Sequence, residues 1–188
     1  MFCILVASTI ILSACQSGRV HTSDGMPPAA KPVAPPQTPA DARANTMAFF
    51  VGQKPDDTNG NGYPDLISVT VMLFSQPHPT AIRENGAFVF TLYPQGRMSD
   101  AGVKPLGSWR MEGPAVQRAR TIALGGPCYQ FQLSMLDPSC GIATDKLALD
   151  QADLVCQFIP SDGAPAVKSD GVRTIQIGKR LAGGAAGR

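Results

Sequence analysis

The sequence predicts an all-β domain, a β-sandwich of about six to eight short strands with one short helix. Two observations lead to this prediction. Apolar and polar residues alternate over several short segments, which is the period of a strand with one buried face. The 188 residues also include 19 glycines and 17 prolines but only 6% aromatic residues. This balance favours many turns over a helical bundle, and a second sheet would cover the apolar face of the first.

Six segments show the strand pattern. In the four central ones the apolar residues fall on one face, and these residues are Ile67, Val69, Val71 and Leu73; Phe88, Phe90 and Leu92; Tyr129, Phe131, Leu133 and Met135; and Ala152, Leu154, Cys156 and Phe158. The first strand is expected at residues 47–51. The last is expected at residues 173–177, with Ile175 and Ile177 facing inward.

Turn and helix signals separate these strands. Glu84-Asn85-Gly86 predicts a turn before the third strand, and Ser161-Asp162-Gly163 predicts one before the last. A short helix is expected at residues 114–121, because Pro114 suits the first helical position after Gly113.

The first fifteen residues carry a targeting signal. Residues 2–12 form an apolar run that is too short to span a bilayer and fits the core of a secretory signal. Leu12-Ser13-Ala14-Cys15 resembles the lipobox of bacterial lipoproteins, in which the peptide is cut before the cysteine and the cysteine is acylated, for example with palmitate. The resemblance implies that Cys15 is the lipidated first residue of the mature protein and anchors it to a membrane.

This segment departs from the signal pattern in one respect. No Lys or Arg precedes Arg19, although a signal peptide begins with positive charge. A start site assigned a few codons too late would explain the gap. The alternatives are an ordinary signal peptide or a buried strand with a chance cysteine.

The chain therefore divides into four segments. They are a signal peptide at residues 1–14, the lipidated Cys15 with a disordered proline-rich linker at 15–45, a sandwich domain at 46–179 and a disordered tail at 180–188. Gln16 follows the acylated cysteine, and the absence of aspartate there resembles the outer-membrane sorting pattern of lipoproteins from double-membraned bacteria. The formal charge of +2, without a basic run, gives no indication of nucleic-acid binding.

One loop, residues 57–65, carries oxygen donors at a regular spacing that suits a bound metal ion. Oxygen-bearing side chains stand at its positions 1, 3, 5 and 9, a backbone carbonyl is available at position 7, and Gly62 stands at position 6; the donors in order are Asp57, Asn59, Asn61, the Tyr63 carbonyl and Asp65. A hard cation such as Ca²⁺ collects six or more oxygens at about 2.3–2.6 Å only where the backbone wraps around it. The loop looks like the calcium loops of FG-GAP repeats and, less closely, those of thrombospondin type 3 repeats.

The same loop departs from known calcium motifs. Ser68 stands at position 12, where an EF-hand loop has glutamate, and Pro55 precedes the loop in place of a helix. Those repeat families form arrays, whereas this chain has one copy, so the resemblance implies a metal site and not a propeller. With two carboxylates, we expect a dissociation constant near about 10⁻⁴ M. The alternative is that Asn59-Gly60 and Asn61-Gly62 are plain turn dipeptides.

Three cysteines remain after residue 15, and no disulfide is expected among them. An extended strand at residues 129–136 would separate Cys128 from Cys140 by more than the intervening chain can retrace. Cys156 shares the apolar face of Leu154 and Phe158, so it is expected to be a small core residue.

Enzyme motifs are not visible in the sequence. His78 lies between two prolines without a nucleophile signature, and Ser108 lacks the glycine that a nucleophile elbow requires. Trp109 either stacks on a sugar or closes the end of the core. The expected function is a non-catalytic scaffold at the cell envelope. The alternative is a module that binds glycans or peptides through Trp109 or Tyr129, and an enzyme ranks third.

Overall fold

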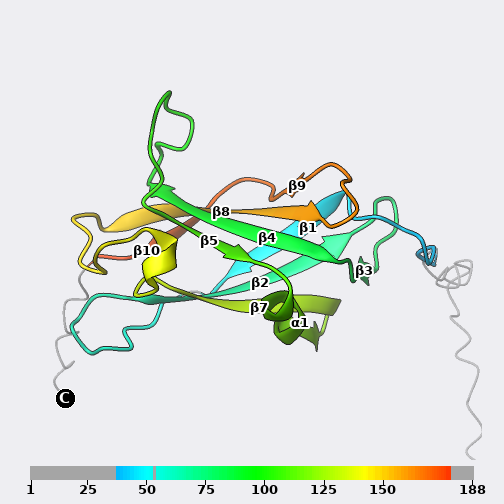
Figure 1. The fold of residues 1–188 in the computed structure, drawn as a ribbon, viewed down its shortest axis with the longest axis horizontal. Coiled ribbons are helices and arrows are strands. Elements are labelled where there is room, and N and C mark those ends of the chain that lie inside the picture. The colour runs from blue at the N-terminus through cyan, green and yellow to red at the C-terminus, as the bar shows by residue number, and fades with distance from the viewer. Residues whose placement is uncertain (1–36, 53, 179–188) are drawn as a thin grey trace, which may run out of the picture. The chain divides into compact units, whose positions relative to one another are not determined.

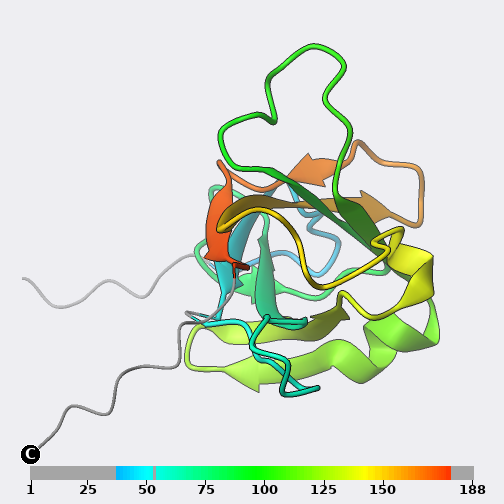
Figure 2. The same cartoon turned by 90° about the vertical axis from the view of Figure 1, so that its left-hand side faces the viewer.

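The computed structural model describes residues 37–52 and 54–178. The predicted signal peptide, Cys15, the first part of the linker and residues 180–188 lie outside the described residues. Two antiparallel sheets face each other as separate layers (Figures 1 and 2). The predicted all-β sandwich is therefore confirmed.

The first sheet has the order β1-β2-β7-β6, with β3 paired to β2. Its strands are β1 (Thr46–Val51), β2 (Leu66–Phe74), β3 (Ala81–Ile82), β6 (Arg120–Ala123) and β7 (Gly126–Ser134). The second sheet has the order β10-β8-β4-β5, with β9 paired to β8. Its strands are β4 (Gly86–Pro94), β5 (Gly107–Met111), β8 (Gln151–Pro160), β9 (Val167–Lys168) and β10 (Arg173–Gln176).

The core lies between the sheets and is rich in aromatic rings. The ring of Phe88 lies 4.8 Å from that of Tyr129, 5.2 Å from that of Phe131 and 4.9 Å from that of Phe158, measured between centroids. Every apolar residue on the four predicted strand faces is buried. Period-two alternation predicted these faces correctly because each strand has one side against the opposite sheet.

Some connections differ from the prediction. Glu84-Asn85-Gly86 does not close a hairpin, because it leads from β3 in the first sheet to β4 in the second. Strands β3, β5, β6 and β9 were not predicted, since none of them contains a long alternating run. The helix α1 (Pro114–Ala119) is shorter than the expected 114–121, because the chain becomes extended at Arg120 and enters β6.

The domain begins before the predicted boundary at residue 46. Ala44 is buried in the core, and its N–H donates to the Glu84 carboxylate at 2.7 Å. The Arg43 guanidinium lies 3.2 Å from the Asp162 carboxylate. Residues 43–45 thus belong to the folded domain, because they are held by contacts far along the chain that the linker-like composition does not reveal.

Within the described residues, Cys128, Cys140 and Cys156 are buried free thiols. Cys156 lies in the main core as predicted, and burial raises the pKa of its thiol. Cys128 packs with Met72 and Ala81 in a smaller cluster of its own. No helix among the described residues is long and apolar enough to cross a membrane.

Strand register defines two opposite ends of the sandwich. Leu66, at the start of β2, is paired with Ser134, at the end of β7. Phe74, at the other end of β2, is paired with Thr46, where the chain enters β1. We call the first the loop end, because the loop 57–65 precedes Leu66 there. The second is the linker end (Figure 1).

Candidate functional site

The candidate calcium loop is closed at its base by backbone pairing. The Asp56 N–H donates to the Leu66 carbonyl at 2.8 Å, and the Asp65 N–H donates to the Asp56 carbonyl at 2.7 Å. The Asp65 carbonyl accepts from the Met135 N–H at 2.7 Å. The loop is therefore fixed to both β2 and the end of β7.

Asp57 and Asp65 both turn their carboxylates into the loop. One oxygen of Asp57 accepts the Gly60 N–H at 2.8 Å, and the other accepts the Gly62 N–H at 2.7 Å. Asp65 is completely buried and accepts from the Thr58 hydroxyl at 2.7 Å and from the Asn59 N–H at 3.2 Å. Backbone N–H groups satisfy these charges, which is how a buried carboxylate becomes tolerable.

The two glycines are required by backbone conformation. Gly60 has φ 72° and Gly62 has φ 85°, both in the left-handed region that glycine adopts without steric cost. A Cβ at either position would meet no atom within 4 Å, so the restriction comes from the backbone and not from crowding. The glycine predicted at position 6 thus makes the sharp turn that the loop needs.

Asp145 is a member of this site that sequence reasoning missed. Its buried carboxylate accepts from the side-chain amide of Asn59 at 2.8 Å and from that of Asn61 at 2.7 Å. The hydrogen bond from Asn59 is the main reason that the pKa of Asp145 lies below its usual value. Only the pairing of β2 with β7 brings the segment after Met135 to the loop, so no local pattern around Asp145 signals this contact.

Hydrogen bonds link Asp57, Asn59, Asn61 and Asp65 within the loop, and they join Asn59 and Asn61 to Asp145, which lies outside the predicted set. Carboxylate and amide oxygens are the chemistry that Ca²⁺ prefers, so the donor set fits that ion. The described arrangement is closed by hydrogen bonds: the Asn59 side-chain oxygen accepts the Asn61 N–H, and the Asn61 side-chain oxygen accepts the Tyr63 N–H. Among the described residues, no three His, Cys, Asp or Glu side chains lie close enough together to form a ready metal site. An ion would have to replace some of these hydrogen bonds.

Trp109 lies in the core and offers no stacking face. The residue is 3% exposed, and its indole N–H donates to the Ser134 carbonyl at 2.8 Å. Tyr129 is also fully buried. The interpretation of either ring as a ligand platform loses its geometric basis, because both are covered by the opposite sheet.

His78 lines a depression at the linker end without an acidic partner. The other residues around it are Asn45, Thr46, Met47, Ala48, Phe74, Gln76, Pro77 and Pro79, none of which carries a carboxylate. The Ser108 hydroxyl donates to the Phe90 carbonyl at 3.1 Å. Ser108 is not among the residues that line the depression around His78.

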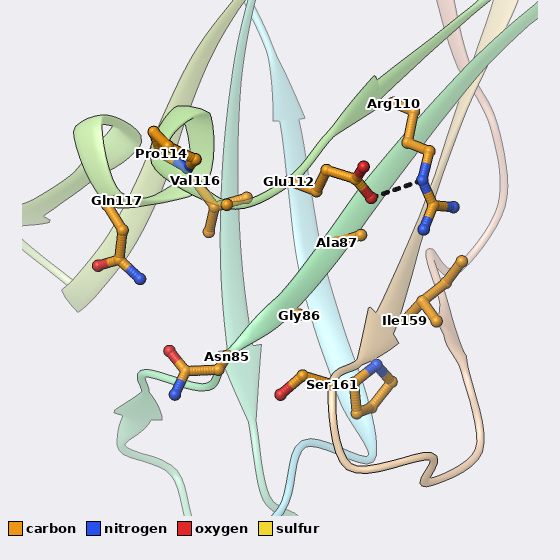
Figure 3. Close-up of a pocket in the computed structure, with 12 residues that line it drawn as sticks. Asn85, Gly86, Ala87, Arg110, Glu112, Pro114, Val116, Gln117, Ile159 and Ser161 are labelled. Carbon is orange, nitrogen blue, oxygen red and sulfur yellow. Dashed lines mark hydrogen bonds and ion pairs between the residues drawn. The ribbon is translucent and has the colours of Figure 1, made fainter.

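A second pocket lies beside α1 and has a volume of about 760 Å³ (Figure 3). Its apolar floor includes Ala87 and Ile159, and the amide side chains of Asn85 and Gln117 lie at its rim. An Arg110–Glu112 ion pair of 2.7 Å borders it on the β5 side. Sequence reasoning did not find this pocket, because its residues come from four separate elements.

No family model matches this chain, and no curated protein matches its sequence. The interpretation of both sites consequently rests on their residues and geometry.

Proposed function

We propose that this chain is a lipid-anchored protein of the bacterial cell envelope that displays a non-catalytic β-sandwich as a scaffold. The observation that carries the proposal is Leu12-Ser13-Ala14-Cys15 directly after an apolar run of signal-peptide length. Acyl chains contribute about 0.8 kcal/mol per buried methylene, so a multiply acylated Cys15 holds the protein on a membrane without a spanning helix. Gln16 favours the outer membrane in a double-membraned cell.

The buried carboxylates support the scaffold role. Four carboxylate residues are buried in the described part of the chain: Asp65, Glu84, Asp145 and Asp153. Each accepts hydrogen bonds that hold a loop or a strand end; Asp153, for example, accepts from the Gly96 N–H at 2.7 Å and from the Thr174 hydroxyl at 2.8 Å. These four carboxylates are thus engaged in holding the structure together.

Calcium binding at the loop end is part of this proposal. Asp57, Asn59, Asn61, the Tyr63 carbonyl and Asp65 would hold the ion, and bound Ca²⁺ would stiffen the connection that joins β1 to β2. An ion that binds the folded state alone stabilises it by mass action.

The anchor is tested by labelling cells with a clickable fatty acid. Cys15→Ser should abolish the label, because the thiol is the lipid acceptor, whereas the matched control Cys3→Ser should keep it. Cys3 is discarded with the signal peptide in this proposal. Equal labelling of the wild type and Cys15→Ser would refute the lipoprotein assignment.

Ligand binding is a second candidate, and the pocket beside α1 is the observation that favours it. Amide side chains next to an apolar floor suit the hydroxyl and amide groups of a glycan or a peptide. Binding screens with glycan and peptide libraries would test this role. A ligand is assigned to this pocket only if the double variant Asn85→Ala with Gln117→Ala abolishes its binding. The control double variant Gln130→Ala with Gln132→Ala, at two exposed positions, should still bind it.

A further inference from the structure

The hairpin between β6 and β7 exposes a run of apolar residues. Ile122 is 74% exposed and Leu124 is fully exposed, and Ala123 and Gly125 beside them are exposed as well. Single exposed apolar residues are normal on a protein surface, but four in succession are uncommon unless they have a function. We call residues 122–125 the hairpin tip.

The hairpin tip is held firmly in place by the sheet beneath it. A Cβ at Gly125 would lie 2.7 Å from the methyl carbon of Met72, so the backbone of the tip rests directly on that side chain. Met72 in turn packs with Ala81 and Cys128 in the smaller apolar cluster. Because the backbone is seated on this cluster, Leu124 projects into solvent from a fixed base.

Arg83 contacts the hairpin, and Arg118 and Arg120 precede its tip in the chain. Residues 113–136 contain no Asp or Glu but include Arg118 and Arg120. Arg83 approaches from β3, and its guanidinium donates to the Thr121 carbonyl at 3.4 Å. Glu84, the nearest acidic residue along the chain from Arg83, is buried. The surface therefore combines exposed aliphatic side chains with arginines and no neighbouring exposed carboxylate in this segment.

The hairpin tip lies at the linker end of the sandwich. The Glu84 carboxylate accepts the Ala44 N–H at 2.7 Å, which fixes the point where the linker joins the domain. Arg83, the preceding residue, contacts β6 through Thr121. The hairpin and the start of the domain are thus connected through two adjacent residues, Arg83 and Glu84.

We propose that this hairpin is a second membrane contact, which inserts Ile122 and Leu124 among the headgroups of an anionic leaflet while Arg83 and Arg118 face lipid phosphates. The proposal rests on the lipid anchor proposed above, since the anchor brings the domain to the membrane. The proline-rich linker predicted from the sequence would span on the order of 30 Å as a coil, so the anchor would keep the hairpin at a high effective concentration near lipid. Aliphatic residues flanked by arginine are the composition that binds such interfaces.

A second copy of the chain is the less favoured occupant. Strand β6 is an edge strand, and edge strands can pair with one another. Strand β6 has only four residues, however, so pairing through it alone would bury little surface. An anionic lipid surface would in addition attract Arg83 and Arg118.

A fluorophore at the hairpin tip tests the proposal. An environment-sensitive dye is attached at Leu124→Cys in the acylated chain, reconstituted in vesicles of phosphatidylcholine with or without phosphatidylglycerol. The matched control places the dye at Ala101→Cys, which is exposed on the protruding loop between β4 and β5 (Figures 1 and 2). The dye at position 124 should shift to the blue and be quenched by spin-labelled lipid only in the anionic vesicles, and the dye at 101 should not respond. Arg83→Gln with Arg118→Gln should reduce the quenching several-fold.

A second experiment tests the hairpin contact independently of the proposed lipid anchor. Residues 16–188 with an amino-terminal histidine tag are held on the same vesicles through a nickel-chelating lipid, so hairpin contact is measured without acylation. Quenching at position 124 in this arm supports the hairpin contact even if Cys15 proves not to be acylated. Equal responses at 124 and 101, or a response that does not require phosphatidylglycerol, would overturn the proposal. A blue shift that grows with protein concentration in the absence of vesicles would assign the surface to a second copy instead.

Discussion

The Tyr129 hydroxyl is bonded to both backbone polar groups of Glu84. It accepts the Glu84 N–H at 3.0 Å and donates to the Glu84 carbonyl at 2.8 Å. Tyr129 lies on β7, whereas Glu84 lies where the chain leaves the first sheet for the second. Because the Glu84 carboxylate also holds the Ala44 N–H, this pair secures both the crossover between the sheets and the start of the domain.

Tyr129→Phe should lower the free energy of unfolding by about 1–3 kcal/mol, because it leaves two buried backbone groups without partners. Urea denaturation of the wild type and the variant measures the difference. Tyr93→Phe, at a half-buried position on β4, is the control and should change stability much less. A loss below a few tenths of a kcal/mol would mean that the bonds to Glu84 do not matter.

Alkaline pH should destabilise the domain through the same residue. Burial raises the pKa of Tyr129 above its ordinary value. The folded state therefore holds this proton more tightly than the unfolded state does. The resulting stability is fully present below about pH 10, the unfolded pKa, and is lost as the pH rises through the folded pKa. Urea midpoints between about pH 8 and about pH 11 should fall further for the wild type than for Tyr129→Phe, and parallel curves would contradict the prediction.

Truncation of the linker should show where the domain starts. Removing residues 16–36 should leave the melting temperature nearly unchanged. Removing residues 16–45 should lower it by several degrees, because Ala44 is part of the core and bonded to Glu84. The measurement is thermal melting of the two truncated chains. Equal melting temperatures would show that the folded domain begins at residue 46.

Acid should weaken the loop end through Asp145. Hydrogen bonds from Asn59 and Asn61 hold the pKa of Asp145 below its usual value. Its contribution to stability is present above about pH 4, the unfolded pKa, and is lost as the pH falls through the lowered folded pKa. Asp145→Asn should flatten the fall in urea midpoint between about pH 6 and about pH 3, whereas the exposed control Asp170→Asn should not. An unchanged slope in Asp145→Asn would show that this carboxylate is not coupled to folding.

Calcium should stabilise the wild-type domain by about 1.4 kcal/mol at a tenfold excess over the dissociation constant. The measurement is thermal melting in EDTA and in millimolar calcium. Magnesium should stabilise the domain much less than calcium does, because Mg²⁺ requires a stricter octahedral geometry and keeps its bound waters. Asp57→Ala with Asp65→Ala should remove the calcium increment, and the exposed pair Asp100→Ala with Asp170→Ala should keep it. Identical wild-type curves with and without calcium would leave the Asn-Gly turns as the whole explanation of the loop.

The sequence alone determined the layers of this protein. Alternation in β2, β4, β7 and β8 fixed which side chains face the core, because a strand has a period of two and one side must be buried. The glycines of the loop 57–65 were equally readable, since only glycine adopts a positive φ without steric cost. These features depend on neighbours a few residues apart.

The tertiary structure alone decided the contacts between residues that lie far apart in the sequence. Asp145 reaches Asn59 and Asn61 only because β2 pairs with β7, and Glu84 reaches Ala44 only because the crossover between the sheets passes the start of β1. Trp109 is buried because the opposite sheet covers it, which no pattern around residue 109 records. Chain topology sets such contacts, and a local pattern of residues contains no information about which remote segment will pack against it.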